Sequence, residues 1–226
     1  MNILVIGAGG VGASMASIAE TRSFFTQFVL ADISLSRAEE AIAQLDDRSK
    51  FVAEQVDARD MTAIKALIER VKADVVVNAC DPRMNEPIFN AAFEAHCNYI
   101  DMAMNLSEPH ASNPYEEVGS PLGADQLAAD QAWRDRGLLA LVGMGVEPGL
   151  SDVFARYAAD NLFDTIDEIG VRDGSNLSID GLDFAPTFSI WTTIEECLNP
   201  PIVWEKNRGL YTTDCFSEPE VFHFPA

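Results

Sequence analysis

Basic side chains are scarce in this sequence: 15 Lys and Arg stand against 36 Asp and Glu, which gives a net charge of −21. A chain this acidic repels phosphate backbones and anionic lipid, so nucleic acid and membrane surfaces are not expected partners. The imbalance is uneven, because residues 1–113 carry −7 and residues 114–226 carry −14. We interpret it as solvated acidic surface, with the alternative that the second region handles a cationic, amine-bearing substrate.

Long apolar runs and clustered cysteines are also missing. No apolar run approaches the roughly 20 residues that span a bilayer, and no basic and apolar leader precedes the first strand, so we expect neither an anchor nor a signal peptide. Cys80, Cys97, Cys197 and Cys215 lie far apart without metal-type spacing, and no carboxylate or cysteine pattern surrounds the three histidines. We therefore predict no metal site, and a cytoplasmic protein with reduced thiols.

The chain does have a regular alternation of strand-like and helix-like segments from residue 1 to about 105. The run Val75-Val-Val-Asn78 shows no polar alternation, as expected for a strand buried on both faces of a parallel sheet. Strands are predicted at 3–6, 28–31, 51–55, 75–78 and 98–102, and helices at 11–19, 36–45, 61–71 and 86–95. Repeated strand–helix units predict right-handed crossovers, and therefore the α/β class with a Rossmann doubly wound parallel sheet.

The pattern changes after residue 105. The polar stretch 105–124 contains three prolines and is long for a loop, which indicates a hinge or a functional segment. Helices are then predicted at 126–136, 149–161 and 193–198, and strands at 138–142, 166–172, 201–205, 209–213 and 221–224, with a hairpin turn at 207–209. We therefore predict a dinucleotide-binding domain over 1–124, with 125–226 completing its sheet and leading into a second α+β substrate and dimerisation domain. The chain stops near a strand without a closing helix, so we expect that domain to be incomplete at the C-terminus.

The most informative motif follows the first strand, where Gly7-x-Gly9-x-x-Gly12 is succeeded twenty positions later by Asp32 at the end of the second strand. Strand, glycines, helix, second strand and acid together form a dinucleotide-binding fingerprint, with the pyrophosphate at the helix N-terminus. The predicted cofactor-binding residues are Gly7, Gly9, Gly10, Val11, Gly12, Asp32, Arg37, Asp57, Asn78, Ala79 and Cys80.

Some of these residues also have a second interpretation. Asp32 is placed to accept a hydrogen bond from a ribose 2′-OH, which favours NAD, whereas Arg37 could offset its charge and leaves NADP open. Asp57 is predicted at the adenine edge, or else as a helix N-cap near Asp60. Asn78-Ala79-Cys80 ends a strand where a cofactor would cross, or else packs as ordinary core.

Two further segments are candidates for the substrate. Tyr99 and Asp101 share one face of a strand end, where Asp101 could hold a substrate amine and Tyr99 transfer a proton; the alternative for Asp101 is a loop cap. The glycine-rich turn at 143–149 opens a helix and suits an anionic group such as a carboxylate. The predicted substrate-binding residues there are Gly145, Glu147, Pro148 and Gly149. Glu147 fits an anion poorly unless it points away or binds an amine.

These motifs together resemble the saccharopine dehydrogenase family in the broad sense, including saccharopine reductases and carboxynorspermidine dehydrogenases. The matching segments are 3–12 with Asp32, 76–79, 99–101, 143–149 and 188–191, where Phe-Ser-Ile-Trp is similar to that family's Phe-Ser-Trp. The resemblance implies a Rossmann domain with an inserted α/β substrate domain, often in a dimer, and an NAD(P)-linked oxidation of a secondary amine to an imine that water hydrolyses. It also implies that Asp101 and the 143–149 turn line the substrate pocket, and that members are longer and return to the first domain.

The leading hypothesis is therefore an NAD(P)-dependent oxidoreductase acting on the CH–NH bond of an amino-acid-derived secondary amine. Its partners would be a small amino-acid or polyamine-like substrate and a second copy of the chain. One alternative is a nucleotide-sensing regulatory module, similar to the ligand-gating domains of potassium uptake systems. Another is a family member that binds the nucleotide but has lost its chemistry.

Overall fold

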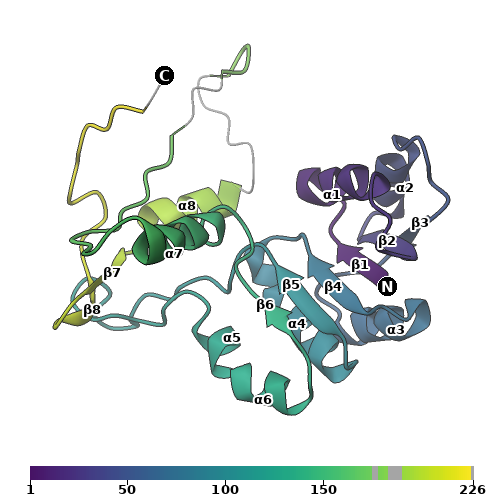
Figure 1. The fold of residues 1–226 in the computed structure, drawn as a ribbon, viewed down its shortest axis with the longest axis horizontal. Helices are drawn as coiled ribbons and strands as arrows, with labels where there is room; N and C mark the ends of the chain where they lie inside the picture. Colours follow the sequence, from purple (N-terminus) through teal and green to yellow (C-terminus); the bar gives the residue numbers. More distant parts are fainter. Residues whose placement is uncertain (175–177, 183–189, 225–226) are drawn as a thin grey trace. The chain divides into compact units, whose positions relative to one another are not determined.

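The computed structural model describes residues 1–174, 178–182 and 190–224. The chain divides into two compact units (Figure 1). The first comprises Met1–Leu106 and Gly123–Leu150, and the second comprises Ser107–Leu122 and Ser151–Ala226. The chain therefore passes between the units three times.

The first unit is built on a six-stranded parallel sheet with the order β3-β2-β1-β4-β5-β6. Its strands are β1 (Asn2–Ile6), β2 (Gln27–Asp32), β3 (Phe51–Gln55), β4 (Val75–Asn78), β5 (Asn98–Asp101) and β6 (Ala140–Leu141). This is the doubly wound Rossmann order, in which the crossover from β3 back to β4 leaves a crevice at the carboxyl ends of the strands. The predicted fold class is confirmed.

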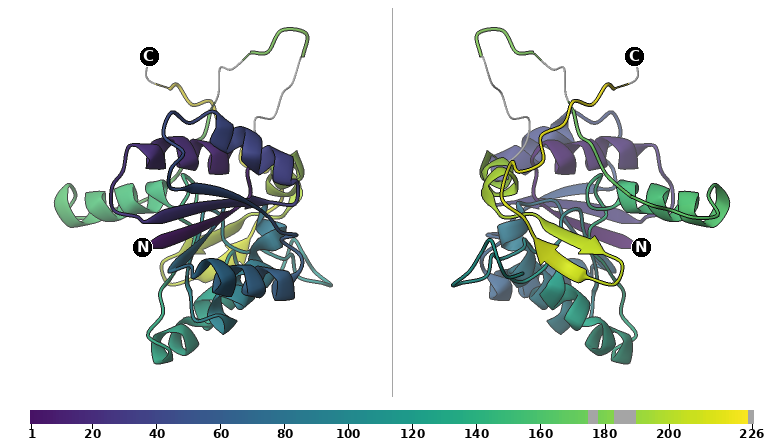
Figure 2. Two further views of the ribbon diagram at one scale, coloured as in Figure 1. Left: turned by 90° about the vertical axis from the view of Figure 1, so that its right-hand side faces the viewer. Right: turned by 90° about the vertical axis from the view of Figure 1, so that its left-hand side faces the viewer.

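Helices cover both faces of this sheet (Figure 2). The helices of the first unit are α1 (Gly10–Glu20), α2 (Leu35–Ala43), α3 (Met61–Val71), α4 (Asn85–Glu94), α5 (Ala124–Ala128) and α6 (Asp130–Asp135), with a 3₁₀ turn, η1, at Pro82–Met84. Side chains of β1 alternate between the two cores: Leu4 and Ile6 pack with α3 and α4, and Ile3 and Val5 pack with α1 and α2. Burial on both faces explains why this strand is a continuous apolar run.

An aromatic cluster holds β5, α4 and α6 together. The Phe89 ring lies 5.2 Å from Tyr99 and 4.8 Å from Trp133, measured between centroids. Trp133 is 3% exposed and Tyr99 is fully buried. Such edge and tilted ring pairs add about 0.5–1.5 kcal/mol beyond area burial.

Two predictions near the end of this sheet were partly wrong. The single helix expected at 126–136 is divided at Ala129 into α5 and α6, and the strand expected at 138–142 is only two residues long. The two helical segments are anchored separately, because Gln126 is buried in α5 and Trp133 is buried in α6. β6 lies at the edge of the sheet and pairs with β5 over its two residues.

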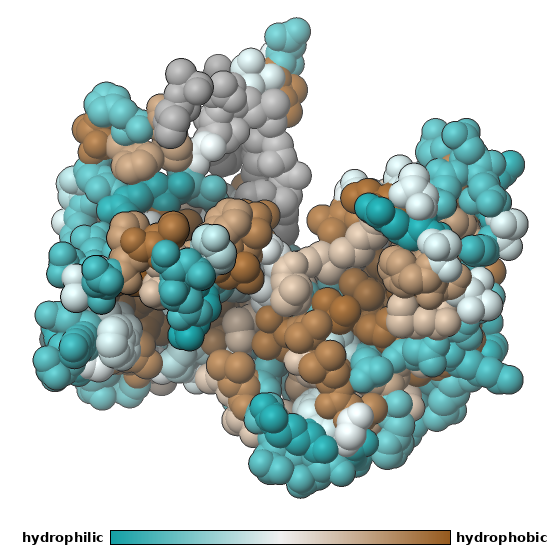
Figure 3. Space-filling model, viewed as in Figure 1, coloured by the Kyte–Doolittle hydropathy of each residue, from teal (hydrophilic) through white to brown (hydrophobic). Residues whose placement is uncertain are grey.

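The described part of the second unit contains α7 (Leu150–Asn161, whose first residue belongs to the first unit), α8 (Ile190–Leu198) and the antiparallel hairpin of β7 (Ile202–Glu205) and β8 (Gly209–Thr212). The predicted turn at 207–209 is confirmed, with Asn207 and Gly209 both at positive φ. Apolar side chains reach the surface over α7 (Figure 3), where Val153 is 60% and Phe154 64% exposed.

The strands predicted at 166–172 and 221–224 were wrong. These segments have no ladder partner among the described residues, and Ile169 and Val221 are 62% and 84% exposed. Apolar alternation produces a strand only where a neighbouring strand supplies hydrogen bonds and a core accepts one face. The two segments have no neighbouring strand, and no described residue of the second unit is buried, so neither condition is met for them.

Candidate functional site

The glycine turn between β1 and α1 has the geometry that a dinucleotide requires. Gly7 has a φ of +108°, and a Cβ on it would lie 2.6 Å from the Ala79 carbonyl oxygen. A Cβ on Gly12 would lie 1.9 Å from the Gly7 carbonyl oxygen, so only glycine lets α1 approach the strand this closely. A Cβ on Gly9 would meet nothing within 4 Å, which leaves that side of the turn open to a ligand.

The N-terminus of α1 faces this opening without a side-chain cap. Gly9 is the N-cap residue, and Gly10, Val11 and Gly12 form the first turn. Their N–H groups lack carbonyl partners within the helix and carry the positive end of its dipole, which favours an anionic group such as pyrophosphate.

A cavity of about 460 Å³ lies at the carboxyl ends of β1 to β4. It is lined by Ile6, Gly7, Gly9, Asp32, Ile33, Arg37, Val56, Asp57, Ala58, Arg59, Ala79, Cys80, Asp81 and Met84. Seven of the eleven predicted cofactor-binding residues are in this lining. Of the others, Gly10, Val11 and Gly12 form the first turn of α1, and Asn78 is buried at 2% exposure behind the wall.

Asp32 is only 7% exposed, and the backbone already engages its carboxylate. Oδ2 accepts a hydrogen bond from the N–H of Ala8 at 2.9 Å, and Oδ1 accepts one from the N–H of Ser34 at 2.9 Å. The Arg37 guanidinium lies 3.5 Å from Oδ1 and is 59% exposed. Asp32 therefore ties the glycine turn to the start of α2, with a cationic side chain beside it.

Asp57 is held in a bidentate pair by Arg59, with distances of 2.9 and 2.7 Å to Nε and Nη2. The guanidinium lowers the pKa of this carboxyl to about 2. Asp60 caps α3 by accepting from the N–H of Ala63, so Asp57 does not act as that N-cap. The same Asp-x-Arg arrangement recurs after β4, where Arg83 lies 2.8 Å from Asp81.

Sequence reasoning missed Arg59 and Asp81 in this lining. The signal that could have found them is the repeated Asp-x-Arg directly after two strands that contribute to the same edge of the sheet.

Cys80 forms part of the wall as a neutral thiol. Its Sγ donates to the Ile6 carbonyl oxygen at 3.3 Å. Burial, together with the charges of Asp32 and Asp81, raises the pKa of this thiol to about 12. None of the four cysteines forms a disulfide.

Behind the wall lies a buried polar network between β4 and β5. The Asn78 amide donates to the Tyr99 hydroxyl at 3.2 Å and to Asn85 at 2.7 Å, and its oxygen accepts from the N–H of Cys80 at 2.9 Å. The Tyr99 hydroxyl is in turn hydrogen-bonded to Asp101. Burial raises the pKa of the Tyr99 phenol, which is therefore neutral across the physiological range.

Asp101 is 1% exposed and each of its oxygens has a donor. Oδ2 accepts from the Gln126 amide at 2.7 Å, and Oδ1 accepts from the N–H of Gly143 at 2.7 Å. Burial raises the pKa of this carboxyl, and the three donors oppose that shift. These contacts favour structural roles for Tyr99 and Asp101 over the proton transfer and amine binding expected from the sequence.

Several backbone N–H groups of the 143–149 turn are already hydrogen-bonded within the protein. Besides Gly143, the N–H of Met144 donates to the Asp101 carbonyl oxygen at 2.8 Å, and the N–H of Gly145 donates to the Pro148 oxygen at 3.0 Å. Glu147 is exposed and precedes Pro148 through a cis peptide bond. Gly149 has a φ of +134° and ends the turn directly before α7. Three N–H groups that could have bound a substrate carboxylate are therefore occupied.

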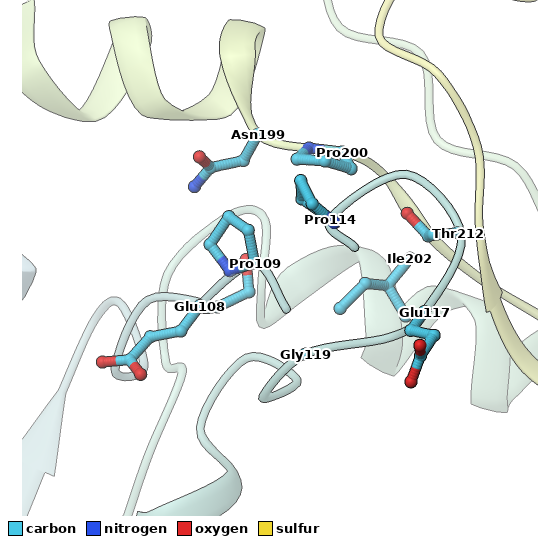
Figure 4. A pocket seen from close by; sticks show the side chains of 10 residues that line it. Glu108, Pro109, Pro114, Glu117, Gly119, Asn199, Pro200, Ile202 and Thr212 are labelled. Carbon is cyan, nitrogen blue, oxygen red and sulfur yellow. The ribbon is translucent and has the colours of Figure 1, made fainter. Parts of the chain in front are cut away.

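A smaller cavity lies within the second unit, between the 107–122 segment and the start of the β7–β8 hairpin (Figure 4). Its volume is about 10 Å³, about the least that one water molecule needs. Pro109, Pro114 and Pro200 turn toward one another, while the carboxylates of Glu108 and Glu117 point away (Figure 4). This is loop packing and not a ligand site.

Within the described ranges, no three His, Cys, Asp or Glu side chains gather as metal ligands. No helix in that part of the chain is long and apolar enough to cross a membrane.

The strand order, the tight glycine turn and the cavity at the strand ends define a Rossmann domain for a dinucleotide. Residues 3–141 match the family model described as the saccharopine dehydrogenase NADP-binding domain. The chain belongs to this family, as its motifs indicated. The Phe188-Ser189 part of the expected 188–191 match lies outside the described residues, and Trp191 lies in α8.

Curated relatives match most or all of the chain. Carboxynorspermidine synthase of Vibrio cholerae serotype O1 is 32% identical over 100% of this chain and 55% of its own length. Carboxyaminopropylagmatine dehydrogenase of Synechocystis sp. is 28% identical over 86% of this chain and 46% of its own length. The chain thus spans about half the length of the curated relatives it matches. Apo saccharopine dehydrogenase (L-Glu forming) of Saccharomyces cerevisiae has a similar fold, with a TM-score of 0.53 at 15% identity, over 71% of this chain and 31% of that one.

Proposed function

We propose that this chain is the cofactor-binding part of an NAD(P)-dependent oxidoreductase that acts on the C–N bond of a carboxylated polyamine. The observation that carries this is the open Gly9 side of the turn beside the cavity, in a chain with these relatives. By their names, one of the relatives reported above forms carboxynorspermidine and the other dehydrogenates carboxyaminopropylagmatine. Both compounds are carboxylated polyamines, so we prefer this class to saccharopine.

The bound nicotinamide would supply reversible hydride transfer at its C4. In the oxidative direction, the substrate C–H bond gives up its hydride and the amine nitrogen loses a proton to water. The resulting imine adds water and separates into a primary amine and a carbonyl compound. No residue has to form a covalent bond to the substrate, so the protein acts through position and charge.

The residues of this chain would bind and orient the cofactor. The first turn of α1 receives the pyrophosphate, and Gly9 leaves room for its approach. The wall formed by Ala79 and Cys80 bounds the crevice where the cofactor crosses the sheet. Asp101 holds the 143–149 turn in place, and we no longer assign it to the substrate amine.

The geometry also supports a choice of nucleotide. Asp32 favoured NAD in the sequence, but its oxygens are engaged by Ala8 and Ser34 and its charge is offset by Arg37. The Arg37 side chain is exposed enough to turn toward a 2′-phosphate, and Arg59 lines the same cavity. We therefore propose a preference for NADP, in accord with the family description.

The nucleotide proposal is tested by titrating the full-length protein with NADPH and NADH and following nicotinamide fluorescence. We expect NADPH to bind more tightly, and Arg37→Gln to weaken NADPH about tenfold, equivalent to ~1.4 kcal/mol, with little effect on NADH. Arg22→Gln, at an exposed arginine outside the cavity lining, is the control. Equal Kd values for the two nucleotides in the unmodified protein would overturn the proposed preference for NADP.

The reaction is tested by oxidation of carboxynorspermidine and of saccharopine with NADP⁺, followed by absorbance of the reduced nicotinamide. We expect turnover of carboxynorspermidine and little of saccharopine. Turnover of saccharopine alone would overturn the substrate class. Tight nucleotide binding without turnover of either compound would favour a binding or sensing protein. The homodimer and the cytoplasmic location stay predictions.

A further inference from the structure

The chain passes between its two units at three points, after Leu106, after Leu122 and after Leu150. At each of these points, the residues that belong to the first unit lie in one small region of it. A buried pair, Asp101 and Gln126, lies beside all three on the side of the first unit.

The first two passages are joined through Gln126. Its Oε1 accepts from the N–H of Asn105 at 2.7 Å, while its Nε2 donates to Asp101 at 2.7 Å. The carbonyl oxygen of Asn105 accepts from the N–H of Gly123 at 2.8 Å. The first unit therefore holds both ends of the segment 107–122. Asn105, before it, and Gly123, after it, are hydrogen-bonded to each other, and Gln126 links Asn105 to Asp101.

The third passage is joined to the same carboxylate through the 143–149 turn. The N–H of Gly143 donates to Asp101 Oδ1, and the N–H of Leu150 donates to the Gly145 carbonyl oxygen at 3.0 Å. A Cβ on Gly145 would lie 2.4 Å from the Met102 carbonyl oxygen, so this turn packs directly against the chain that follows β5.

We propose that Asp101 and Gln126 form a clamp that fixes all three passages from one buried point, and are therefore positioning residues. Both side chains are buried, at 1% and 5% exposure. Both carboxylate oxygens of Asp101 accept a hydrogen bond, and the amide oxygen and nitrogen of Gln126 each have a hydrogen-bond partner. Removing one of the two residues leaves the facing polar group of the other buried without this partner, which is costly, so the three passages loosen together. This inference does not depend on the proposed reaction.

The test is amide hydrogen exchange in the full-length protein without substrate. In Gln126→Leu, we expect exchange at Asn105, Gly123 and Gly143 to rise together by about tenfold or more, while β1 and β2 change little. Ile88→Val, at a buried residue of α4, is the control, because it lowers stability without touching the clamp. Faster exchange at Asn105 with Gly143 unchanged would overturn the proposal, since the passages would then be independent.

A second variant gives a signature that a general loss of packing would not. Gln126→Glu places a second carboxyl 2.7 Å from Asp101, and the two cannot both be ionised at that distance. Tyr99, the other titratable group against Asp101, stays neutral in this range. We expect the variant to keep the clamp at low pH, where the pair shares a proton, and to lose it as pH rises.

The readout for this variant is exchange at Asn105 and Gly143, corrected for the intrinsic pH dependence of exchange, together with NADPH affinity. Exchange at both amides should increase with pH along the same titration curve, which is that of the pair of carboxyls at positions 126 and 101 in the variant. NADPH affinity should stay within about twofold of that of the unmodified protein. A flat corrected profile at both amides would overturn the clamp. If this variant does not fold, the Gln126→Leu comparison alone decides.

Discussion

At the scale of single residues, the rim of the nucleotide cavity is close to electrically neutral although the protein is strongly acidic. Each of three carboxylates at the strand ends has its own arginine: Asp32 with Arg37, Asp57 with Arg59, and Asp81 with Arg83. An anionic dinucleotide would meet paired charges there instead of bare carboxylates. The local pairing, and not the net charge of −21, decides what this cavity can bind.

The Asp57–Arg59 pair gives a direct titration test. Arg59 lowers the pKa of Asp57 to about 2, so Arg59→Gln should raise it toward the ordinary 3.8. Because the folded pKa is the lower one, the pair's contribution to stability is present above the unfolded pKa and is lost as pH falls toward 2. The measurement is the NMR shift of the Asp57 carboxyl carbon against pH, with Arg48→Gln as control. An unchanged midpoint in Arg59→Gln would mean that the pair is not formed in solution.

The sequence could place Tyr99 and Asp101 at the carboxyl end of a strand, but not identify what surrounds them. Periodicity along 98–101 predicts the face they share, and that part agrees with the structure. The partners of Asp101, Gln126 and Gly143, are 25 and 42 residues away, and no motif predicts the hydrogen bonds that they donate to its carboxylate. Polar partners that are distant in the sequence therefore decide whether such residues are catalytic or structural, and the local sequence pattern does not predict those partners.

At the scale of elements, the β1–α1 turn separates the demands of folding from those of binding. Gly12 is required by the fold, because any Cβ there would collide with the Gly7 backbone. Gly9 has open space instead, so glycine at that position suits close approach of a ligand.

Alanine variants of the two glycines should therefore behave differently. Gly12→Ala should lower the free energy of unfolding by about 1–3 kcal/mol, as overpacking does. Gly9→Ala should cost about 1 kcal/mol or less, the difference between glycine and alanine at an N-cap, yet weaken NADPH binding about tenfold or more. Urea unfolding and nucleotide titration measure the two effects. Nucleotide binding that survives Gly9→Ala unchanged would contradict the assigned approach of the pyrophosphate.

Elements were predictable where local pattern and tertiary environment agreed. The parallel strands and α1 to α4 were found within about two residues at each end, the usual uncertainty of element boundaries. The segments 166–172 and 221–224 have strand-like composition but lack a partner among the described residues, so composition alone misled. Gln126 and Trp133 likewise divided a continuous helical pattern by anchoring its halves separately.

At the scale of the whole molecule, charge is divided unequally between the two units. Counting Lys and Arg against Asp and Glu, the first unit carries −8 and the smaller second unit −13. The excess lies outside the neutral rim of the nucleotide cavity. A field of this sign attracts cationic ligands and repels anionic ones over roughly one Debye length.

This field predicts how salt should affect the proposed reaction of the full-length protein. Raising ionic strength from about 0.02 to 0.2 M shortens the Debye length from roughly 20 to 7 Å, so attraction of a polyamine is screened. We expect KM for carboxynorspermidine to rise several-fold while kcat at saturation changes little, because screening acts on encounter and not on hydride transfer. The neutral nucleotide rim should leave NADPH affinity much less dependent on salt. A KM that is flat or falls with salt would show that the acidic surface of the second unit only solvates the protein, as the simpler interpretation of its composition holds.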